Sequence, residues 1–174
     1  MRLFVALEVP EDVQDRLSDL QDALPHARWV DPAGMHLTLR FIGDLDRRTA
    51  EDVDDVLCGI AARPFSVRIE GVGTFGRPVR ALWAGVAPNP PLAALAEKVD
   101  AALNRLRLDI DRRKFTPHVT LARFREAPGP ALEAYLSAHG SLALDPFPVT
   151  RFTLFSSFRS HGGAEYTPER HYIL

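Results

Sequence analysis

Two short segments of the sequence repeat one pattern, a histidine followed two residues later by a threonine. The first is His36–Leu39, with the sequence HLTL, and the second is His118–Leu121, with the sequence HVTL. Successive side chains of a β-strand point to opposite faces of a sheet. On a strand, each histidine therefore shares a face with its threonine, and the aliphatic residues lie on the other face.

Two imidazoles that face each other across a gap suit the hydrolysis of a phosphodiester. Histidine has an ordinary pKa of about 6.5, so either protonation state is accessible near neutral pH. A neutral ring can take a proton from an attacking water while a charged ring donates one to the leaving oxygen, and each transfer contributes roughly 10²–10⁴-fold. The hydroxyls of Thr38 and Thr120 can donate hydrogen bonds to phosphate oxygens. We therefore predict His36 and His118 as catalytic residues and both threonines as phosphate ligands.

Other chemistries find less support in the sequence. A lone His-x-Thr on a strand is more often structural, but two copies at equivalent places favour a functional role. The sequence has no Gly-x-Ser-x-Gly nucleophile elbow and no phosphate loop ending in Gly-Lys-Ser/Thr. Neither motif has a second histidine or clustered carboxylates at metal-ligand spacing. We therefore expect no metal site and no cofactor.

The elements expected to position these motifs also repeat. A strand, a proline, a helix and a strand that begins with His-x-Thr follow one another from Leu3 to Leu39, and again from Leu82 to Leu121. This repetition predicts an internal duplication. We expect an α+β fold with two pseudo-symmetric lobes, each an antiparallel β-sheet backed by helices, and a central cleft that carries both histidines. Residues 1–174 are expected to form a single bilobal domain.

Simple alternation along the two strands makes predictions for three further side chains. In the first motif it places Arg40 on the face of His36, where its charge could contribute to the cleft, and Phe41 on the opposite face. In the second motif it places Arg123 on the face opposite His118.

Composition and charge argue against several classes of protein, among them nucleic-acid-coating, disulfide-stabilised and membrane-spanning proteins. The 174 residues carry a formal net charge of −2, which argues against a protein that coats nucleic acid by bulk electrostatics. The single Cys58 excludes an intramolecular disulfide and a zinc-type cysteine cluster. The opening segment lacks the length of a secretion signal, and no later segment approaches a membrane span. We expect a monomeric cytoplasmic protein with no membrane partner.

At its two motifs the sequence resembles the 2H phosphoesterase superfamily, which is defined by a pair of His-x-Thr/Ser-x motifs. It looks specifically like the bacterial RNA 2′,3′-cyclic phosphodiesterases, once called 2′-5′ RNA ligases. The resemblance covers nearly the whole chain and is carried by the segments RLFVALEVP, MHLTLRFIGD, GVGTFGRP, RALWAGV and FTPHVTLARF.

This resemblance implies an activity and roles for individual residues. His36 would be the proton donor and His118 the proton acceptor in opening an RNA 2′,3′-cyclic phosphate to a 2′-phosphomonoester, without metal or ATP. The reverse reaction would join RNA ends by a 2′-5′ bond, and tRNA fragments are among the candidate RNAs. Arg123 matches a family arginine that contacts the phosphate, so a strand end or β-bulge must bring it around to the histidines. Phe41, at the same offset in the first motif, could stack on a nucleobase.

Two alternatives stay open at the level of sequence. One is another branch of the same superfamily, which would act on small cyclic nucleotides or on an ADP-ribose cyclic phosphate. The other is a protein that binds the RNA end without cleaving it. Comparing turnover of an RNA oligonucleotide with turnover of cyclic mononucleotides distinguishes an RNA phosphodiesterase from an enzyme of the other branch. Tight binding of the RNA end without product would identify the non-catalytic binding protein.

Overall fold

The computed structural model describes residues 1–111, 113–160 and 163–174. Its strands are β1 Arg2–Glu8, β2 Ala27–Trp29, β3 His36–Asp44, β4 Phe65–Val67, β5 Ile69–Phe75, β6 Ala81–Val86, β7 His118–Phe124, β8 Phe147–Val149, β9 Arg151–Ser160 and β10 Gly163–Ile173. Its helices are α1 Glu11–Ser18, α2 Arg47–Cys58, α3 Pro90–Asn104 and α4 Ala131–His139, with a 3₁₀ turn η1 at Pro32–Gly34.

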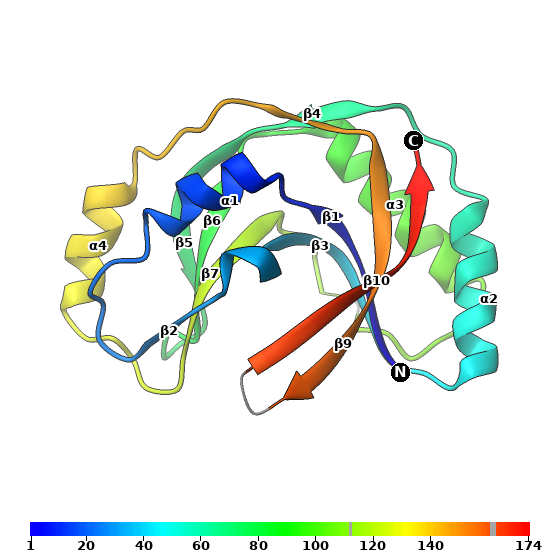
Figure 1. The fold of residues 1–174 in the computed structure, drawn as a ribbon, viewed down its shortest axis with the longest axis horizontal. Coiled ribbons are helices and arrows are strands. Elements are labelled where there is room, and N and C mark those ends of the chain that lie inside the picture. Colours follow the sequence, from blue (N-terminus) through cyan, green and yellow to red (C-terminus); the bar gives the residue numbers. More distant parts are fainter. Residues whose placement is uncertain (112, 161–162) are drawn as a thin grey trace.

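The described residues form one antiparallel sheet of eight strands in two halves. The strand order is β10-β9-β1-β3-β7-β6-β5, and β2 pairs with β7 beside β3. One register pair, Leu37 with Val119, joins β3 of the first half to β7 of the second. The strands β4 and β8 form a separate two-stranded sheet. Figure 1 shows the two halves with α4 at the outer left and α2 and α3 at the right.

The helices cover one face of this sheet because each carries an apolar stripe. The motif residues Leu37, Leu39, Val119 and Leu121 are buried in the same core as the helix residues. These helix residues are Val13 and Leu17 of α1, Val53 and Leu57 of α2, and Leu92, Leu95, Val99 and Leu103 of α3. This face is called the helix face below. The predicted α+β architecture of antiparallel strands backed by helices is confirmed.

Side-chain caps fix where two of the helices begin. Asp46 accepts a hydrogen bond from the backbone N–H of Thr49 at the start of α2, and Asn89 does the same for Leu92 at the start of α3. Such caps satisfy N–H groups that have no partner within the helix. None of the described helices has both the length and the apolarity that a membrane crossing requires.

Candidate active site

The two His-x-Thr motifs cross each other at the junction between the halves of the sheet. Because β3 and β7 are antiparallel and Leu37 pairs with Val119, Thr38 lies opposite His118 and His36 lies opposite Thr120. Directly opposed side chains have Cβ atoms about 5 Å apart, and diagonal ones about 7 Å. The two histidines are therefore diagonal neighbours, each facing the other motif's threonine. The face that carries these four side chains is called the histidine face below.

Each imidazole is fixed by a backbone carbonyl two residues before it. Nδ1 of His36 donates to the carbonyl oxygen of Gly34 at 2.8 Å, and Nδ1 of His118 donates to that of Thr116 at 2.6 Å. A carbonyl only accepts hydrogen bonds, so the proton sits on Nδ1 in both rings. Each Nε2 is thereby left as the atom that takes or gives a proton.

A short 3₁₀ turn positions the backbone carbonyl of Gly34, to which the ring of His36 is hydrogen-bonded. The carboxylate of Asp31 accepts a hydrogen bond from the backbone N–H of Ala33, and Pro32 occupies the first position of the turn. Proline suits this position because its fixed φ matches the turn and its missing N–H is not needed. The turn therefore leaves the carbonyl of Gly34 where the ring of His36 meets it.

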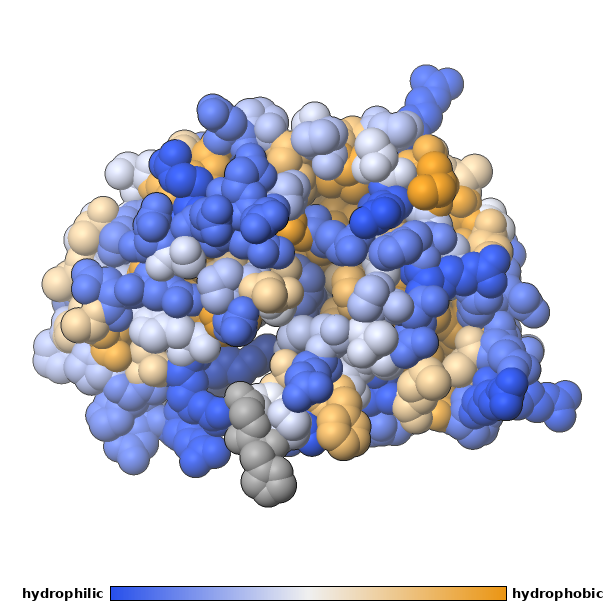
Figure 2. Space-filling view, in the orientation of Figure 1, coloured by the Kyte–Doolittle hydropathy of each residue, from blue (hydrophilic) through white to orange (hydrophobic). Residues whose placement is uncertain are grey.

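Aromatic rings surround His36. Its ring centroid lies 4.8 Å from that of Phe4, 4.9 Å from that of Tyr166 and 6.3 Å from that of Phe155. Phe4 stacks on Phe155 at 5.2 Å and is itself buried. Figure 2 shows the surface hollowed near the middle of the molecule, beside the β9–β10 hairpin. These rings hold the imidazole in place and remove most water from around it.

A second aromatic group surrounds His118. The ring of Phe75 lies 4.8 Å from it in an edge-on arrangement, and that of Trp83 lies 6.2 Å away. Trp83 lies across Gly73, where an added Cβ would come within 2.3 Å of the indole. A glycine is therefore required at this position of β5. Of the described side chains, the Trp83 indole Nε1 is the buried polar atom without a hydrogen-bond partner.

Burial and positive charge lower the pKa of both histidines. Loss of solvation is the main cause for His36 and brings its pKa to about 4. The hydrogen bond to Gly34 opposes this effect, and the charges of Arg123 and His118 add to it. Burial likewise lowers the pKa of His118, and the charge of Arg123 lowers it further. A phosphate anion between the rings would favour the protonated form.

Two β-bulges at equivalent positions decide which side chains join the histidines. In β3, Ala6 of β1 pairs with Thr38 while Val5 pairs with Arg40, so Leu39 is an extra residue. In β7, Trp83 pairs with Thr120 and Leu82 with Ala122, which makes Leu121 the extra residue. A bulge shifts every following side chain to the other face.

The residues five positions beyond each histidine therefore lie on the histidine face. Phe41 pairs with Phe4, its ring lies 5.7 Å from the Phe4 ring, and 48% of it is exposed. Arg123 pairs with Ala81 and is exposed. Phe41 therefore lies on the face opposite to the one that simple alternation predicts, and the bulge required for Arg123 is present.

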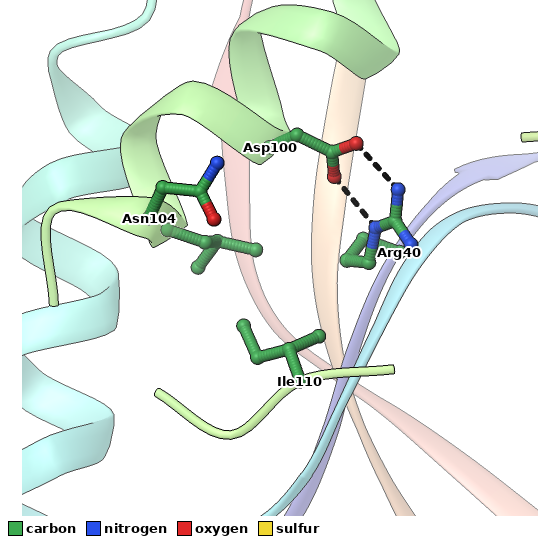
Figure 3. Close-up of a pocket in the computed structure, with 5 residues that line it drawn as sticks. Arg40, Asp100, Asn104 and Ile110 are labelled. Carbon is green, nitrogen blue, oxygen red and sulfur yellow. Dashed lines mark hydrogen bonds and ion pairs between the residues drawn. The ribbon is translucent and has the colours of Figure 1, made fainter. Parts of the chain in front are cut away.

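The same bulge turns Arg40 away from the histidines, contrary to the sequence prediction. Arg40 lies on the helix face, where its Nε donates to Asp100 Oδ1 at 2.6 Å and its Nη2 bonds the other carboxylate oxygen (Figure 3). Its Nη1 donates to the carbonyl oxygens of Asp111 and Arg113 at 2.8 and 3.3 Å. Arg40 therefore binds the chain that leads into the second motif, on the face opposite the histidines, and the prediction that it contributes to the cleft is wrong.

Substitution of Asp100 with alanine is expected to destabilise the protein. The side chain of Arg40 is only 11% exposed, so without its carboxylate it would hold a largely buried charge. We expect the free energy of unfolding in urea to fall by about 2–3 kcal/mol. Glu51→Ala is the matched control, because it breaks an exposed pair with Arg47 at 3.1 Å, and it should cost less than about 0.5 kcal/mol. Equal effects of the two substitutions would contradict a structural role for Arg40.

Several residues of the site are not predicted by the motifs. Phe4, Phe75 and Phe155 contact the histidines from other strands, and only the sheet register relates them to the motifs. No group of three or more His, Cys, Asp or Glu side chains that could hold a metal ion occurs in the described part of the chain. Whether catalysis proceeds without metal stays a prediction.

The sequence is similar to that of a known enzyme family. The family described as the 2′-5′ RNA ligase superfamily matches residues 4–161. An RNA 2′,3′-cyclic phosphodiesterase of Aeropyrum pernix is 30% identical, with 87% of this chain and 90% of that protein covered. One of Thermus thermophilus is 33% identical, with 96% and 87% covered.

Solved structures share the fold over the whole chain. The TT0787 protein of Thermus thermophilus superposes with a TM-score of 0.83 at 26% identity, covering 100% of this chain and 98% of that one. The Escherichia coli LigT protein in complex with 3′-AMP gives a TM-score of 0.82 at 25% identity, covering 99% and 97%. The second of these proteins binds a nucleotide.

Proposed function

The chain belongs to the 2′-5′ RNA ligase superfamily, and from this membership and the paired histidines we propose that it hydrolyses RNA 2′,3′-cyclic phosphate ends to 2′-phosphomonoesters. The crossing of the two motifs carries the proposal, because it makes the two histidines diagonal neighbours on one face, each with its Nδ1 held by a backbone carbonyl and its Nε2 left for proton transfer. Such a pair can deprotonate a nucleophile on one side of a phosphorus atom and protonate the leaving oxygen on the other.

In the proposed reaction, the cyclic phosphate lies between the two rings. Nε2 of His118 takes a proton from a water molecule whose oxygen bonds to phosphorus. The bond from phosphorus to O3′ breaks, and Nε2–H of His36 gives its proton to O3′. Each Nδ1–H remains on its backbone carbonyl, so neither ring rotates during the transfer. With a 5′-hydroxyl in place of water as the attacking group, the same proton transfers and the same breaking of the bond from phosphorus to O3′ form a 2′-5′ linkage.

The other side chains of the histidine face bind the substrate around the reacting atoms. The hydroxyls of Thr38 and Thr120 donate to the non-bridging phosphate oxygens, where charge accumulates in the transition state. The guanidinium of Arg123 adds a full positive charge beside the same oxygens. The exposed ring of Phe41 offers a surface on which the terminal base can stack.

The pH dependence of kcat/KM should report the lowered pKa values of the free protein. The reactive form carries one proton on the histidine pair, and the pair titrates in two steps. The singly protonated pair is most populated below pH 6.5, because the pKa of both histidines is lowered from that value, for His36 to about 4. Above pH 6.5 both rings lose their protons, so kcat/KM should fall about tenfold for each pH unit. An initial-rate series from pH 4 to 8 measures this, and a rise in kcat/KM between pH 6.5 and 8 would contradict the mechanism.

The proposed activity is tested on an RNA oligonucleotide that ends in a 2′,3′-cyclic phosphate, in the presence of excess EDTA. The position of the product phosphate is identified by its resistance to a 3′-specific phosphatase. We expect turnover to a resistant 2′-phosphate at the same rate with and without EDTA. A product with a 3′-phosphate, or turnover of cyclic mononucleotides alone, would exclude the proposal in this form.

A further inference from the structure

A second arginine lies beside Arg123 on the neighbouring strand. Residues Ala27–Trp29 of β2 pair with β7, and Arg28 is directly opposite Arg123 in this ladder. Directly opposed residues of antiparallel strands project from the same face, with Cβ atoms about 5 Å apart. Arg28 is therefore on the histidine face, and it is exposed. Neither motif contains it.

These two arginines have no acidic partner among residues 1–111, 113–160 and 163–174. Glu126, which lies beyond the end of the same ladder, is already 3.7 Å from His26. Like charges directly opposite each other destabilise a sheet. An unpaired pair of guanidinium groups on the face that carries the histidines is therefore suited to bind an anion from the substrate.

The position of Arg28 separates its role from that of Arg123. The backbone N–H of Val30 donates to the carbonyl of Leu121 at 2.8 Å, so β2 continues along the edge of β7 that β3 occupies at His36. By the rise of a strand, Arg28 is about 7–10 Å from the His36–Thr120 pair. The charge of Arg123 lowers the pKa of both histidines. Arg123 is on the strand that carries His118, and Arg28 is beside it on β2, in line with the end of β3 that carries His36.

We propose that Arg28 binds a second phosphate of the substrate, the one that links the terminal nucleotide to its 5′ neighbour. This inference rests on the proposed function and narrows the substrate to a polynucleotide end, because a cyclic mononucleotide has no such phosphate. A polynucleotide carries one phosphate per nucleotide. When its terminal phosphate lies between the histidines, the charge of Arg28, about 7–10 Å away, is placed to meet the next phosphate of the chain. Figure 2 shows hydrophilic side chains bordering the hollow on the side of β2.

The test compares wild type and Arg28→Gln on three substrates. They are uridine 2′,3′-cyclic phosphate, the dinucleotide UpU with a terminal 2′,3′-cyclic phosphate, and the same dinucleotide with a neutral methylphosphonate linkage. For the charged dinucleotide we expect kcat/KM to fall about tenfold, the usual effect of losing a hydrogen bond to a charged group. For the other two substrates the change should be less than about twofold. The slope of log kcat/KM against log salt should weaken by about 0.7 on the charged dinucleotide only.

A control variant and the pattern of losses across the substrates test whether Arg28 acts on the second phosphate. Arg47→Gln, on the exposed surface of α2, should leave all three rates unchanged. An equal loss on all three substrates, or no loss on the charged dinucleotide, would overturn the role of Arg28. ADP-ribose cyclic phosphate is measured as a fourth substrate. A larger loss by Arg28→Gln on this compound than on the charged dinucleotide would assign the site to a pyrophosphate and overturn the RNA assignment.

Failure of the proposed function itself would look different. In that case the wild type would turn over none of the three substrates. The affinity for UpU 2′-phosphate, measured by fluorescence anisotropy, would then still test Arg28, with tenfold weaker binding by Arg28→Gln supporting it and unchanged binding overturning it. Thermal unfolding of Arg28→Gln at or above the wild-type temperature is expected because a repulsion is removed.

Discussion

Replacing either His36 or His118 with alanine is expected to lower kcat on a cyclic-phosphate RNA end by roughly 10²–10⁴-fold. Each substitution removes one proton transfer and leaves the other intact. His36→Ala also removes a ring that contacts Phe4 and Tyr166, so His36→Gln serves as a second variant that fills the same space. Single-turnover rates measured with saturating protein report the chemical step.

The double variant His36→Ala/His118→Ala and a variant of a histidine outside the site test whether the two rings act together in one reaction. If the two rings act on one transition state, the loss in the double variant should be smaller than the product of the two single losses. His139→Ala is the control, because His139 contacts Tyr135 on α4 and has no place in the proposed mechanism. Turnover above 10% of wild type in either single variant would mean that the two-histidine mechanism is wrong.

The pattern of the sequence predicted the fold and the pairing of each histidine with a threonine for a clear reason. Strand alternation is strict as long as a ladder is regular, and His36 to Thr38 and His118 to Thr120 lie before any irregularity. The buried Leu37 and Val119 then decide which face meets the helices. The pairing of these two residues across the halves of the sheet was not readable from either motif.

Alternation failed immediately beyond each motif because of the two bulges. The extra residues are Leu39 and Leu121, and both are ordinary buried leucines. Nothing in their type marks a bulge, since no glycine or proline stands there. The bulge in β3 reversed the expected faces of Arg40 and Phe41. The bulge in β7 reconciles the phosphate-binding role that the resemblance implies for Arg123 with the geometry of its strand.

The sequence pattern did not predict which residues of other strands lie beside the two motifs. Phe4 and Phe155 reach His36 through the order β9-β1-β3, which depends on long-range pairing. Arg28 faces Arg123 through the short strand β2. The segment before the turn at Asp31 gave no signal of such a pairing, because three residues are too few for a periodic pattern.

Substitution of Arg123 with alanine is expected to have the second-largest effect, a loss of roughly 10²–10³-fold in kcat/KM. Arg123 shares the histidine face with both catalytic candidates, and its charge lowers the pKa of each. Removing a positive charge favours the protonated imidazole, so both pKa values should rise in the variant. The pH at which kcat/KM is greatest should therefore move upward as its absolute value falls. The pH–rate profile and an NMR titration of the histidine ring resonances measure the two effects separately.

Lysine at the same position divides the role of Arg123 into charge and geometry. Arg123→Lys keeps the positive charge, so the pKa of both histidines should stay near the wild-type values. It loses the planar fork that can hold two phosphate oxygens at once, so kcat/KM should recover only in part relative to alanine. Full recovery would show that charge alone is needed. A pKa of His36 that does not change in Arg123→Ala would place the guanidinium too far from the ring to contact a phosphate bound between the histidines.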